Sequence, residues 1–217
     1  MLTGLPNRTH VLGQLALSLE MTLRSGGSKG AVAVLFIDID RFKLINDAHG
    51  HTTGDRFLIT VAKCLRQCVL SGDLVGRLSG DEFIIVSSNC SQESVQALGA
   101  RIIDLIGRPM TIGNKLLSHS ASIGVAIANG KDSAEVLIEN ADMAMYKAKS
   151  NGRGCLAYFD QQMRNTALKA ATMEQDLRRA LAAGEIVCYF QPIFRVHDQR
   201  ILGSLKRWHA GSIRCMA

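Results

Sequence analysis

The stretch that decides the fold is RLSGDEF, residues 77–83, which lies between two short apolar runs at residues 74–75 and 83–86. Two short β-prone runs around a pair of small residues predict a tight hairpin. The hairpin places Asp81 and Glu82 at its tip, where carboxylates stay in water while the flanking strands enter a core. Because consecutive strand residues face opposite sides, we expect the two carboxylates to serve a ligand differently. A turn that favours Ser, Gly and Asp for conformational reasons alone is the alternative interpretation.

A second acidic site is predicted at the end of AVAVLFI, residues 31–37, which Asp38 follows directly. Seven consecutive apolar residues predict a strand buried on both faces. In folds of this class, ligands bind at the carboxyl ends of such strands. The next segment, residues 41–55, is polar and punctuated by glycine, and it holds a cation, an amide and several carboxylates.

The rest of the chain predicts helices that alternate with strands. Asn7 and Ser91 are predicted N-caps, Gly26 and Gly27 are expected to end the first helix, and residues 116–128 predict one strand. Alternation around at least four strands indicates an α/β sandwich. Apolar spacing predicts helices over residues 7–23, 42–48, 52–69, 91–106 and 133–148, and a polar, alanine-rich helix over 161–183.

Composition excludes several classes of protein. No apolar run approaches the roughly 20 residues that cross a bilayer, and residues 1–8 lack the features of a signal peptide, so we expect a cytoplasmic protein without a membrane segment. The 6 cysteines form no C-x-x-C pair, so reduced thiols are expected rather than zinc ligands or disulfides.

The net charge of +6 does not indicate nucleic-acid binding. Residues 160–217 hold 9 Lys+Arg against 5 Asp+Glu, so 4 of the 6 excess positive charges lie in this tail. Aromatic residues make up only 5% of the chain, and no stacking motif is present. We therefore expect no nucleic-acid partner.

Three motifs in one order carry a family resemblance: LTGLPNR at residues 2–8, FIDIDRFKLINDAHGHTTGD at residues 36–55, and LSGDEF at residues 78–83. Over residues 1–159 the chain resembles the GGDEF family, the diguanylate cyclases. The resemblance implies an α/β (α+β) sandwich with a central, mostly antiparallel sheet flanked by helices, similar to nucleotidyl cyclases and polymerase palms. It also implies that two GTP molecules are joined into cyclic di-GMP with release of pyrophosphate.

The resemblance implies a metal site for Mg²⁺ or Mn²⁺. The implied ligands are Asp38, the carbonyl of Ile39 and Asp81, with Glu82 as a second metal ligand or proton-handling group. Hard divalent ions held by oxygen atoms suit the attack of a ribose 3′-hydroxyl on an α-phosphate. For Asp81 we favour the ligand role over the base role, because a metal-bound carboxylate is a poor base.

The resemblance also implies contacts with GTP. Without the resemblance each residue has a structural alternative. Lys43 would be a solvated helix lysine, Asp55 an acid at a helix N-terminus, and Lys149 and Arg153 bases at a helix C-terminus, an interpretation as good as function for this last pair. An amide and a carboxylate together suit the edge of guanine. The implied contacts are Lys43, Lys149 and Arg153 with phosphates, Asn46 and Asp55 with guanine, and His51 with a further part of the substrate. Catalytic roles are implied for Asp81, Glu82 and Lys43.

Two positions depart from the family pattern. Ser79 stands at the first glycine of the GGDEF motif, where a side chain weakens binding if the backbone needs a positive φ. The R-x-x-D motif of product inhibition reads LSGD at residues 70–73, so we expect weak or absent product inhibition.

Residues 186–193, IVCYFQPI, resemble the opening strand of an EAL phosphodiesterase domain, but the segment that carries that family's glutamate reads LGSLKRW at residues 202–208. A domain needs roughly 40 residues to bury a core. We therefore expect a linker helix over residues 160–184, a truncated EAL fragment over residues 185–217 that does not fold independently, and no phosphodiesterase activity.

Three hypotheses follow for function. The first is a diguanylate cyclase that needs a homodimer, because each domain holds one GTP, in a chain without an upstream sensor domain. The second is a GTP-binding regulatory domain, weak or inactive in catalysis, from a GGDEF–EAL hybrid. The third is a nonfunctional remnant, against which cooperative melting of residues 1–159 would argue.

Overall fold

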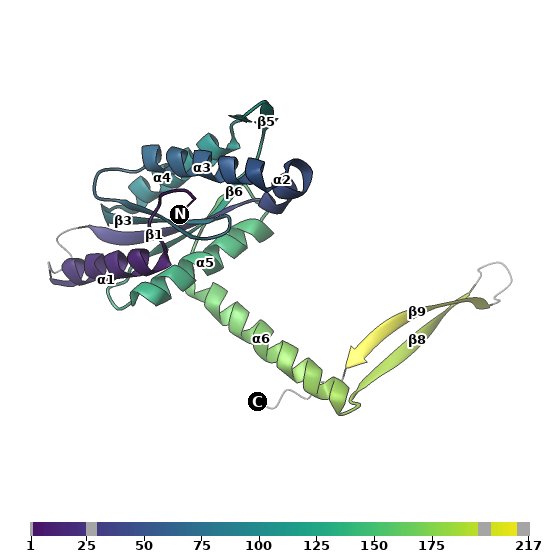
Figure 1. Ribbon diagram of the computed structural model, residues 1–217. Coiled ribbons are helices and arrows are strands. Elements are labelled where there is room, and N and C mark those ends of the chain that lie inside the picture. Colours follow the sequence, from purple (N-terminus) through teal and green to yellow (C-terminus); the bar gives the residue numbers. More distant parts are fainter. Residues whose placement is uncertain (1, 25–29, 195–200, 212–217) are drawn as a thin grey trace. The chain divides into compact units, whose positions relative to one another are not determined.

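The structure is a computed structural model that describes residues 2–24, 30–194 and 201–211, with side chains described as far as residue 185. It divides into two compact units, Met1–Arg164 and Asn165–Ala217. The first unit contains a five-stranded sheet with helices on both faces (Figure 1).

The central sheet has the strand order β2-β3-β1-β6-β7. Every neighbouring pair is antiparallel except β6 and β7, which are parallel. The prediction of a mostly antiparallel sheet flanked by helices is therefore confirmed. The strands are β1 (Ala31–Ile39), β2 (Leu74–Ser79), β3 (Glu82–Cys90), β6 (Ala121–Ile127) and β7 (Leu156–Tyr158).

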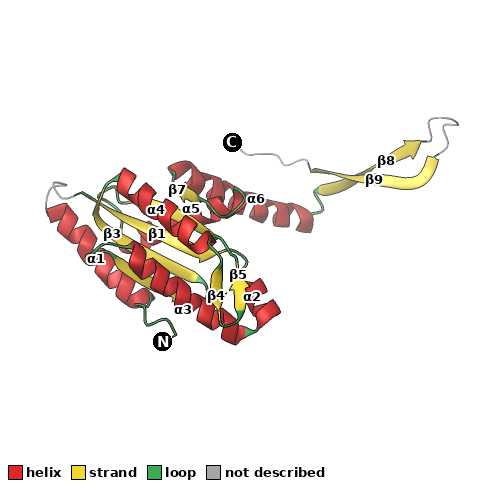
Figure 2. Cartoon of the chain, turned by 90° about the horizontal axis from the view of Figure 1, so that it is seen from above, coloured by secondary structure: helices red, strands yellow, loops and turns green. Residues whose placement is uncertain are grey.

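Two helical layers enclose this sheet (Figures 1 and 2). Side chains of α1 and α5 form a core with one face, and side chains of α3 and α4 form a core with the other. The short helix α2 packs against α3. The helices are α1 (Arg8–Arg24), α2 (Phe42–His49), α3 (His51–Cys68), α4 (Gln92–Gly107) and α5 (Ala134–Ser150).

The central strand β1 is buried on both faces, as its apolar sequence predicts. Its odd-numbered residues over 33–39 belong to the core beneath α3 and α4, and its even-numbered residues over 32–36 belong to the core against α1 and α5. Strand alternation carries the even-numbered face onward to Asp38 and Asp40. Both carboxylates therefore lie on the side of the sheet that α5 covers.

The predicted helix caps are present. The His10 amide donates to Asn7 Oδ1 at 3.1 Å, and the Ser94 amide donates to Ser91 Oγ at 3.2 Å. Each cap satisfies a backbone donor that has no partner inside the helix. The predicted end of the first helix, at residues 26–27, lies outside the described residues.

The prediction of one strand over residues 116–128 was wrong. The structure has a separate hairpin of β4 (Met110–Ile112) and β5 (Lys115–Leu117), and β6 begins only at Ala121. Between them the Ser120 carbonyl accepts the amide of Asp40 at 2.9 Å, which ties the connection to the end of β1. The parallel strand β7 has only three residues and was not predicted, because so short a segment shows no alternation.

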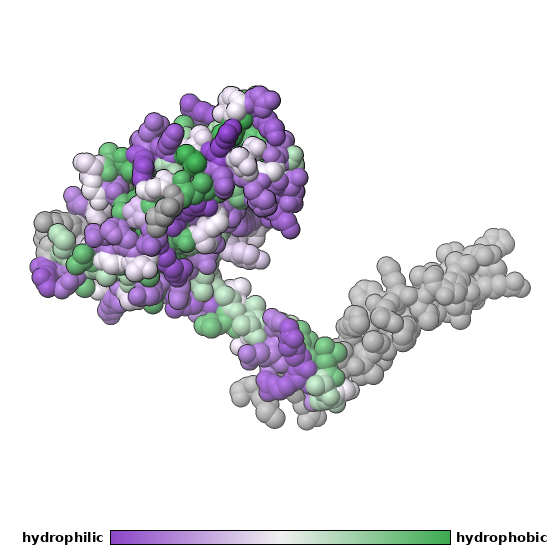
Figure 3. Space-filling view, viewed as in Figure 1, coloured by the Kyte–Doolittle hydropathy of each residue, from purple (hydrophilic) through white to green (hydrophobic). Residues whose placement is uncertain are grey.

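In the second unit, β8 (Ile186–Phe194) and β9 (Ile201–Gly211) form their own two-stranded antiparallel sheet. The helix α6 (Gln161–Ala182), predicted from sequence, begins in the first unit and continues into the second. It exposes apolar side chains such as Leu168 and Met173 among polar ones (Figure 3). Among the described residues, no helix has the length and apolar character to cross a membrane.

Candidate functional site

The predicted hairpin is formed by β2 and β3, with Ser79 opposite Glu82 and a connection of Gly80 and Asp81. Gly80 has a φ of 39°, which glycine adopts without strain. Arg77 closes the turn, because its Nε and Nη2 donate to the Gly80 carbonyl at 2.9 and 2.6 Å. Ser79 has no positive φ, so its backbone does not require glycine, and its hydroxyl donates to Glu82 Oε2.

The end of β1 meets this hairpin. Asp38 is the register partner of Glu82 on β3, and it is only 7% exposed. Lys149 of α5 places its Nζ 2.7 Å from Asp38 Oδ2. The amide of Ile39 donates to the Asp81 carbonyl at 3.4 Å. The fold thus gathers all four predicted metal-site residues at the end of one strand, with one cation among them.

Burial raises the pKa of both central carboxyl groups. For Asp38, burial is the largest cause, the bond to Lys149 opposes it, and the charges of Asp81 and Asp40 add to it. For Asp81, burial is again the largest cause, and the charge of Glu82 adds to it. The carboxylates therefore lie close enough to repel one another, and a bound cation would relieve that repulsion.

The donor set fits a hard divalent cation, because Asp38, Asp81 and Glu82 supply carboxylate oxygens. In the part of the chain that the structure describes, no three His, Cys, Asp or Glu side chains converge to hold a metal ion by themselves. Mg²⁺ bound with a nucleotide typically takes only one or two carboxylates from the protein and further oxygens from phosphates and water. The residues present fit a site that a phosphorylated substrate completes.

The predicted guanine contacts come together where α2 meets α3. A Cβ atom on Gly54 would lie 2.0 Å from Asn46 Oδ1, so the Asn46 amide lies directly against the backbone of α3. Asp55 follows in the same turn of α3, with its side chain exposed. His51 is exposed at the first turn of α3, and Lys43 is exposed on α2.

The two predicted phosphate contacts near the end of α5 both lie beside carboxylates of the β1 end. Lys149 pairs with Asp38, and the Nε of Arg153 lies 3.9 Å from Asp40 Oδ1. The side chain of Arg153 is 46% exposed. The sequence predicted both cations but not their carboxylate partners.

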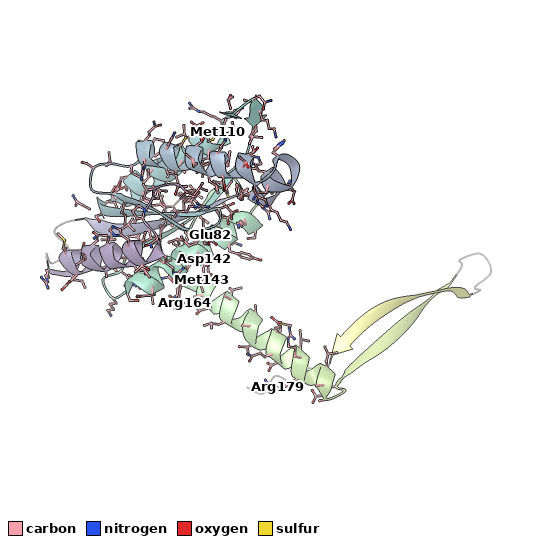
Figure 4. All side chains as sticks on the ribbon, viewed as in Figure 1. Glu82, Met110, Asp142, Met143, Arg164 and Arg179 are labelled. Atoms are coloured by element: carbon pink, nitrogen blue, oxygen red, sulfur yellow. The ribbon has the colours of Figure 1, made fainter. Side chains whose placement is uncertain are left out.

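Two further acidic residues were not predicted as part of the site. Asp40 is buried beside Arg153, and the D-x-D spacing with Asp38 could have revealed it, because residues two apart on a strand share a face. Asp142 of α5 lies beside Glu82 (Figure 4), and partial burial together with that neighbouring charge raises its pKa. No local pattern marks Asp142, since it stands within an ordinary helix.

The segment that corresponds to the product-inhibition motif, residues 70–73, lines a separate hollow of about 580 Å³. Leu70 is 74% exposed there. Arg101 of α4 also lines the hollow, and its Nη2 donates to the Cys68 carbonyl. The hollow therefore has a cation and an acid, Asp73, but an apolar side chain at the first position of the motif.

Fold and site together define the class: a nucleotidyl-cyclase and polymerase-palm type of α/β domain, with carboxylates at the end of a central strand and at an adjoining hairpin. Residues 1–155 match the family described as diguanylate cyclase, GGDEF domain. The chain belongs to the GGDEF family.

Curated relatives and solved structures agree with this assignment. The chain is 37% identical over 212 residues to an uncharacterized signaling protein of Caulobacter vibrioides, a match that covers 95% of this chain and 26% of that protein. It is 35% identical over 211 residues to the bifunctional diguanylate cyclase/cyclic di-GMP phosphodiesterase MucR of Pseudomonas aeruginosa, covering 95% and 30%. The chain thus spans less than a third of the length of these relatives.

Among solved structures, the GGDEF domain of TpbB (YfiN) from Pseudomonas aeruginosa superposes with a TM-score of 0.72 at 35% identity. That match covers 77% of this chain and 97% of the other. The two curated matches extend over more of this chain than the GGDEF match at residues 1–155, so the similarity continues into the tail.

Proposed function

We propose that the first unit is a diguanylate cyclase domain that holds one GTP and joins it to a second GTP on another copy of the chain. The observation that carries this proposal is the grouping of Asp38 with the hairpin carboxylates and with Lys149, whose Nζ is 2.7 Å from Asp38. Buried carboxylates beside a cation at a strand end suit the transfer of a nucleotidyl group, which depends on positioning and charge neutralisation.

Asn46 and Asp55 recognise the guanine base in this proposal. The Asn46 amide offers a donor and an acceptor, and the Asp55 carboxylate accepts from the guanine N–H groups. An adenine edge would leave these groups unpaired, which would make the two residues selective for guanine. Gly54 supports this arrangement, because its lack of a side chain leaves room for the Asn46 amide against α3.

Lys43, Lys149 and Arg153 neutralise the phosphates. Lys149 and Arg153 lie beside the β1 carboxylates, so their charge is concentrated where the α-phosphate must meet the metal ligands. Charge that develops on phosphate oxygens in the transition state is stabilised by such fixed cations.

Asp38, the Ile39 carbonyl and Asp81 would hold Mg²⁺ or Mn²⁺, which supplies electrostatic stabilisation to the reacting phosphate. Glu82 receives the proton of the ribose 3′-hydroxyl at its carboxylate. The Ser79 hydroxyl, which donates to Glu82 Oε2, orients that carboxylate. Attack on the α-phosphate of the partner's GTP then releases pyrophosphate, so the reaction requires two chains.

A second candidate is a GTP-binding regulatory domain with little catalysis. It is favoured by a relative from Pseudomonas aeruginosa, 33% identical over 210 residues, which is named as the cyclic di-GMP phosphodiesterase NbdA without a cyclase activity. In that case GTP binding would control a neighbouring EAL domain. The residues proposed for GTP binding are the same in both candidates.

The experiment is to incubate the purified chain at high concentration with GTP and Mg²⁺ and to follow cyclic di-GMP by mass spectrometry. Asp81→Ala removes a proposed metal ligand, and Asp104→Ala is its matched control, since Asp104 is an exposed carboxylate on α4 that pairs only with Arg108 among the described ion pairs. We expect product from the wild type and from Asp104→Ala, and none from Asp81→Ala.

If the wild type makes no product but binds GTP, and Asn46→Ala loses that binding, the regulatory candidate is selected. Absence of both product and GTP binding in a chain that melts cooperatively would refute both candidates.

A further inference from the structure

Asp40 is a buried carboxylate to which the proposed reaction assigns no role. It follows β1 directly and is 4% exposed. A charge removed from water needs hydrogen bonds in its place. Three donors supply them: Ser122 Oγ at 2.7 Å from Oδ1, and Ser120 Oγ at 2.6 Å and the Gly154 amide at 3.1 Å from Oδ2. Asp40 therefore joins the end of β1, the start of β6 and the loop after α5.

That loop has an unusual backbone. Gly152, Arg153 and Gly154 have consecutive positive φ values of 114°, 67° and 57°. The left-handed region is disfavoured for a residue with a side chain, so surrounding contacts must hold Arg153 there. The contacts present are a bond from the Arg153 amide to the Ala148 carbonyl at 3.2 Å and the bond from the next amide to Asp40.

Two carboxylate–cation pairs run side by side at this point. Asp38 pairs with Lys149 at 2.7 Å, and Asp40 lies 3.9 Å from the Nε of Arg153. Asp38 lies in β1 and Asp40 directly after it, while Lys149 lies in the last turn of α5 and Arg153 in the loop that follows. The two carboxylates differ in the oxygen atoms that a ligand or metal ion could still use, because protein donors already occupy both oxygens of Asp40.

We propose that Asp40 is a positioning residue for GTP binding: through the Gly154 amide and the guanidinium it holds Arg153 where its exposed side chain meets the phosphates. This inference rests on the proposed function. Nearly half of the Arg153 side chain, 46%, is open to a ligand while the backbone beneath it is held. An asparagine at position 40 could still bond to both serines, because a serine hydroxyl also accepts from an amide N–H. It would carry no charge to face the Arg153 guanidinium, however, and its neutral oxygen would accept more weakly from the Gly154 amide.

The experiment compares Asp40→Asn, Arg153→Ala and the double variant, with Asp104→Asn as the same chemical change at an exposed ion pair. The dissociation constant of GTP with Mg²⁺ is measured by calorimetry, and exchange of the Gly154 amide is followed by NMR. We expect each single change at residues 40 and 153 to weaken GTP binding about tenfold, as for the loss of a hydrogen bond to a charged group. The double variant should bind no more weakly than Arg153→Ala, and Asp40→Asn should speed exchange at Gly154.

If the losses of GTP affinity in the two single variants multiply in the double variant, the inference is overturned, since Asp40 would then act independently of Arg153. GTP binding that is unchanged in Asp40→Asn, with only a lower melting temperature, would also overturn it, since that is the result of a structural role alone. If Asp40→Asn does not melt cooperatively, Ser120→Ala removes one donor from the same oxygen, and its smaller loss of affinity should vanish in the Arg153→Ala background. A wild type that binds no GTP would refute the proposed function first, and this inference with it.

Discussion

The clearest test of the proposed guanine contact at Asn46 is Gly54→Ala. A Cβ atom at this position would lie 2.0 Å from Asn46 Oδ1 and 3.1 Å from the ring of Phe42. Ordinary contact begins at 3.4 Å, so the Asn46 amide must move by more than an ångström while the ring moves by a few tenths. The amide is the end of a flexible side chain and can move, but a hydrogen bond displaced by that distance is lost.

The variant should therefore separate affinity from stability. Loss of the amide pairing with a base is worth about 1–3 kcal/mol, which corresponds to a Kd for GTP that rises about 5- to 150-fold. The folded chain gains about 1 kcal/mol from alanine in a helix and loses a similar amount from crowding at Phe42. We expect the melting temperature to change by no more than about 4 °C.

The assay is calorimetric titration with GTP and Mg²⁺, paired with thermal melting. Gly99→Ala is the matched control. Gly99 is also a buried helical glycine, on α4, and its Cβ would lie 2.0 Å from Cδ1 of Leu156 on β7. That control should lower the melting temperature and leave GTP affinity unchanged. Wild-type affinity in a folded Gly54→Ala variant would refute the placement of guanine at Asn46.

Three further predictions concern stability and regulation. Because burial raises the pKa of Asp81 above its usual 3.8, the folded chain binds that proton more tightly than the unfolded chain, and stability falls as the pH rises through the raised value. Asp81→Asn should therefore melt at a higher temperature than wild type at pH 7 without metal. A difference in melting temperature that fails to shrink toward pH 3.8 would contradict this prediction. Gly13→Ala, in α1 with nothing within 4 Å of the added Cβ, should stabilise the chain by about 0.5–1 kcal/mol in denaturant unfolding, and an unchanged midpoint would count against it. Cyclic di-GMP should inhibit wild-type turnover only weakly. Leu70→Arg should introduce stronger inhibition in product titrations, because residue 70 is exposed at the first position of the motif that ends in Asp73. Strong non-competitive inhibition of the wild type would refute this reasoning.

The elements predicted well from sequence are those whose signal is local. The apolar run of residues 31–37 specified a strand buried on both faces, and the small residues at the tip of β2 and β3 specified the hairpin. Asn7 and Ser91 cap helices with bonds to amides only three residues away. In each case the residues that decide the structure are neighbours in the chain, so propensity and hydrogen bonding act before any tertiary contact.

The errors concern segments whose conformation depends on distant partners. Residues 116–128 have the alternation of one strand, yet β5 pairs with β4 while β6 pairs with β1. The strand β7 exists because it pairs in parallel with β6, with Ile123 opposite Leu156. Its three residues carry no periodic signal of their own.

By itself the sequence determined the strand that carries Asp38, the hairpin that carries Asp81 and Glu82, and the identity of the cations near the end of α5. Only the tertiary structure decided that Lys149 pairs with Asp38 and that the Asn46 amide lies against Gly54. The same holds for Asp40, whose three donors stand 80, 82 and 114 residues away in the chain. A buried carboxylate selects its donors by proximity in space, which the packing of α5 and β6 against β1 creates and which no local pattern of residues encodes.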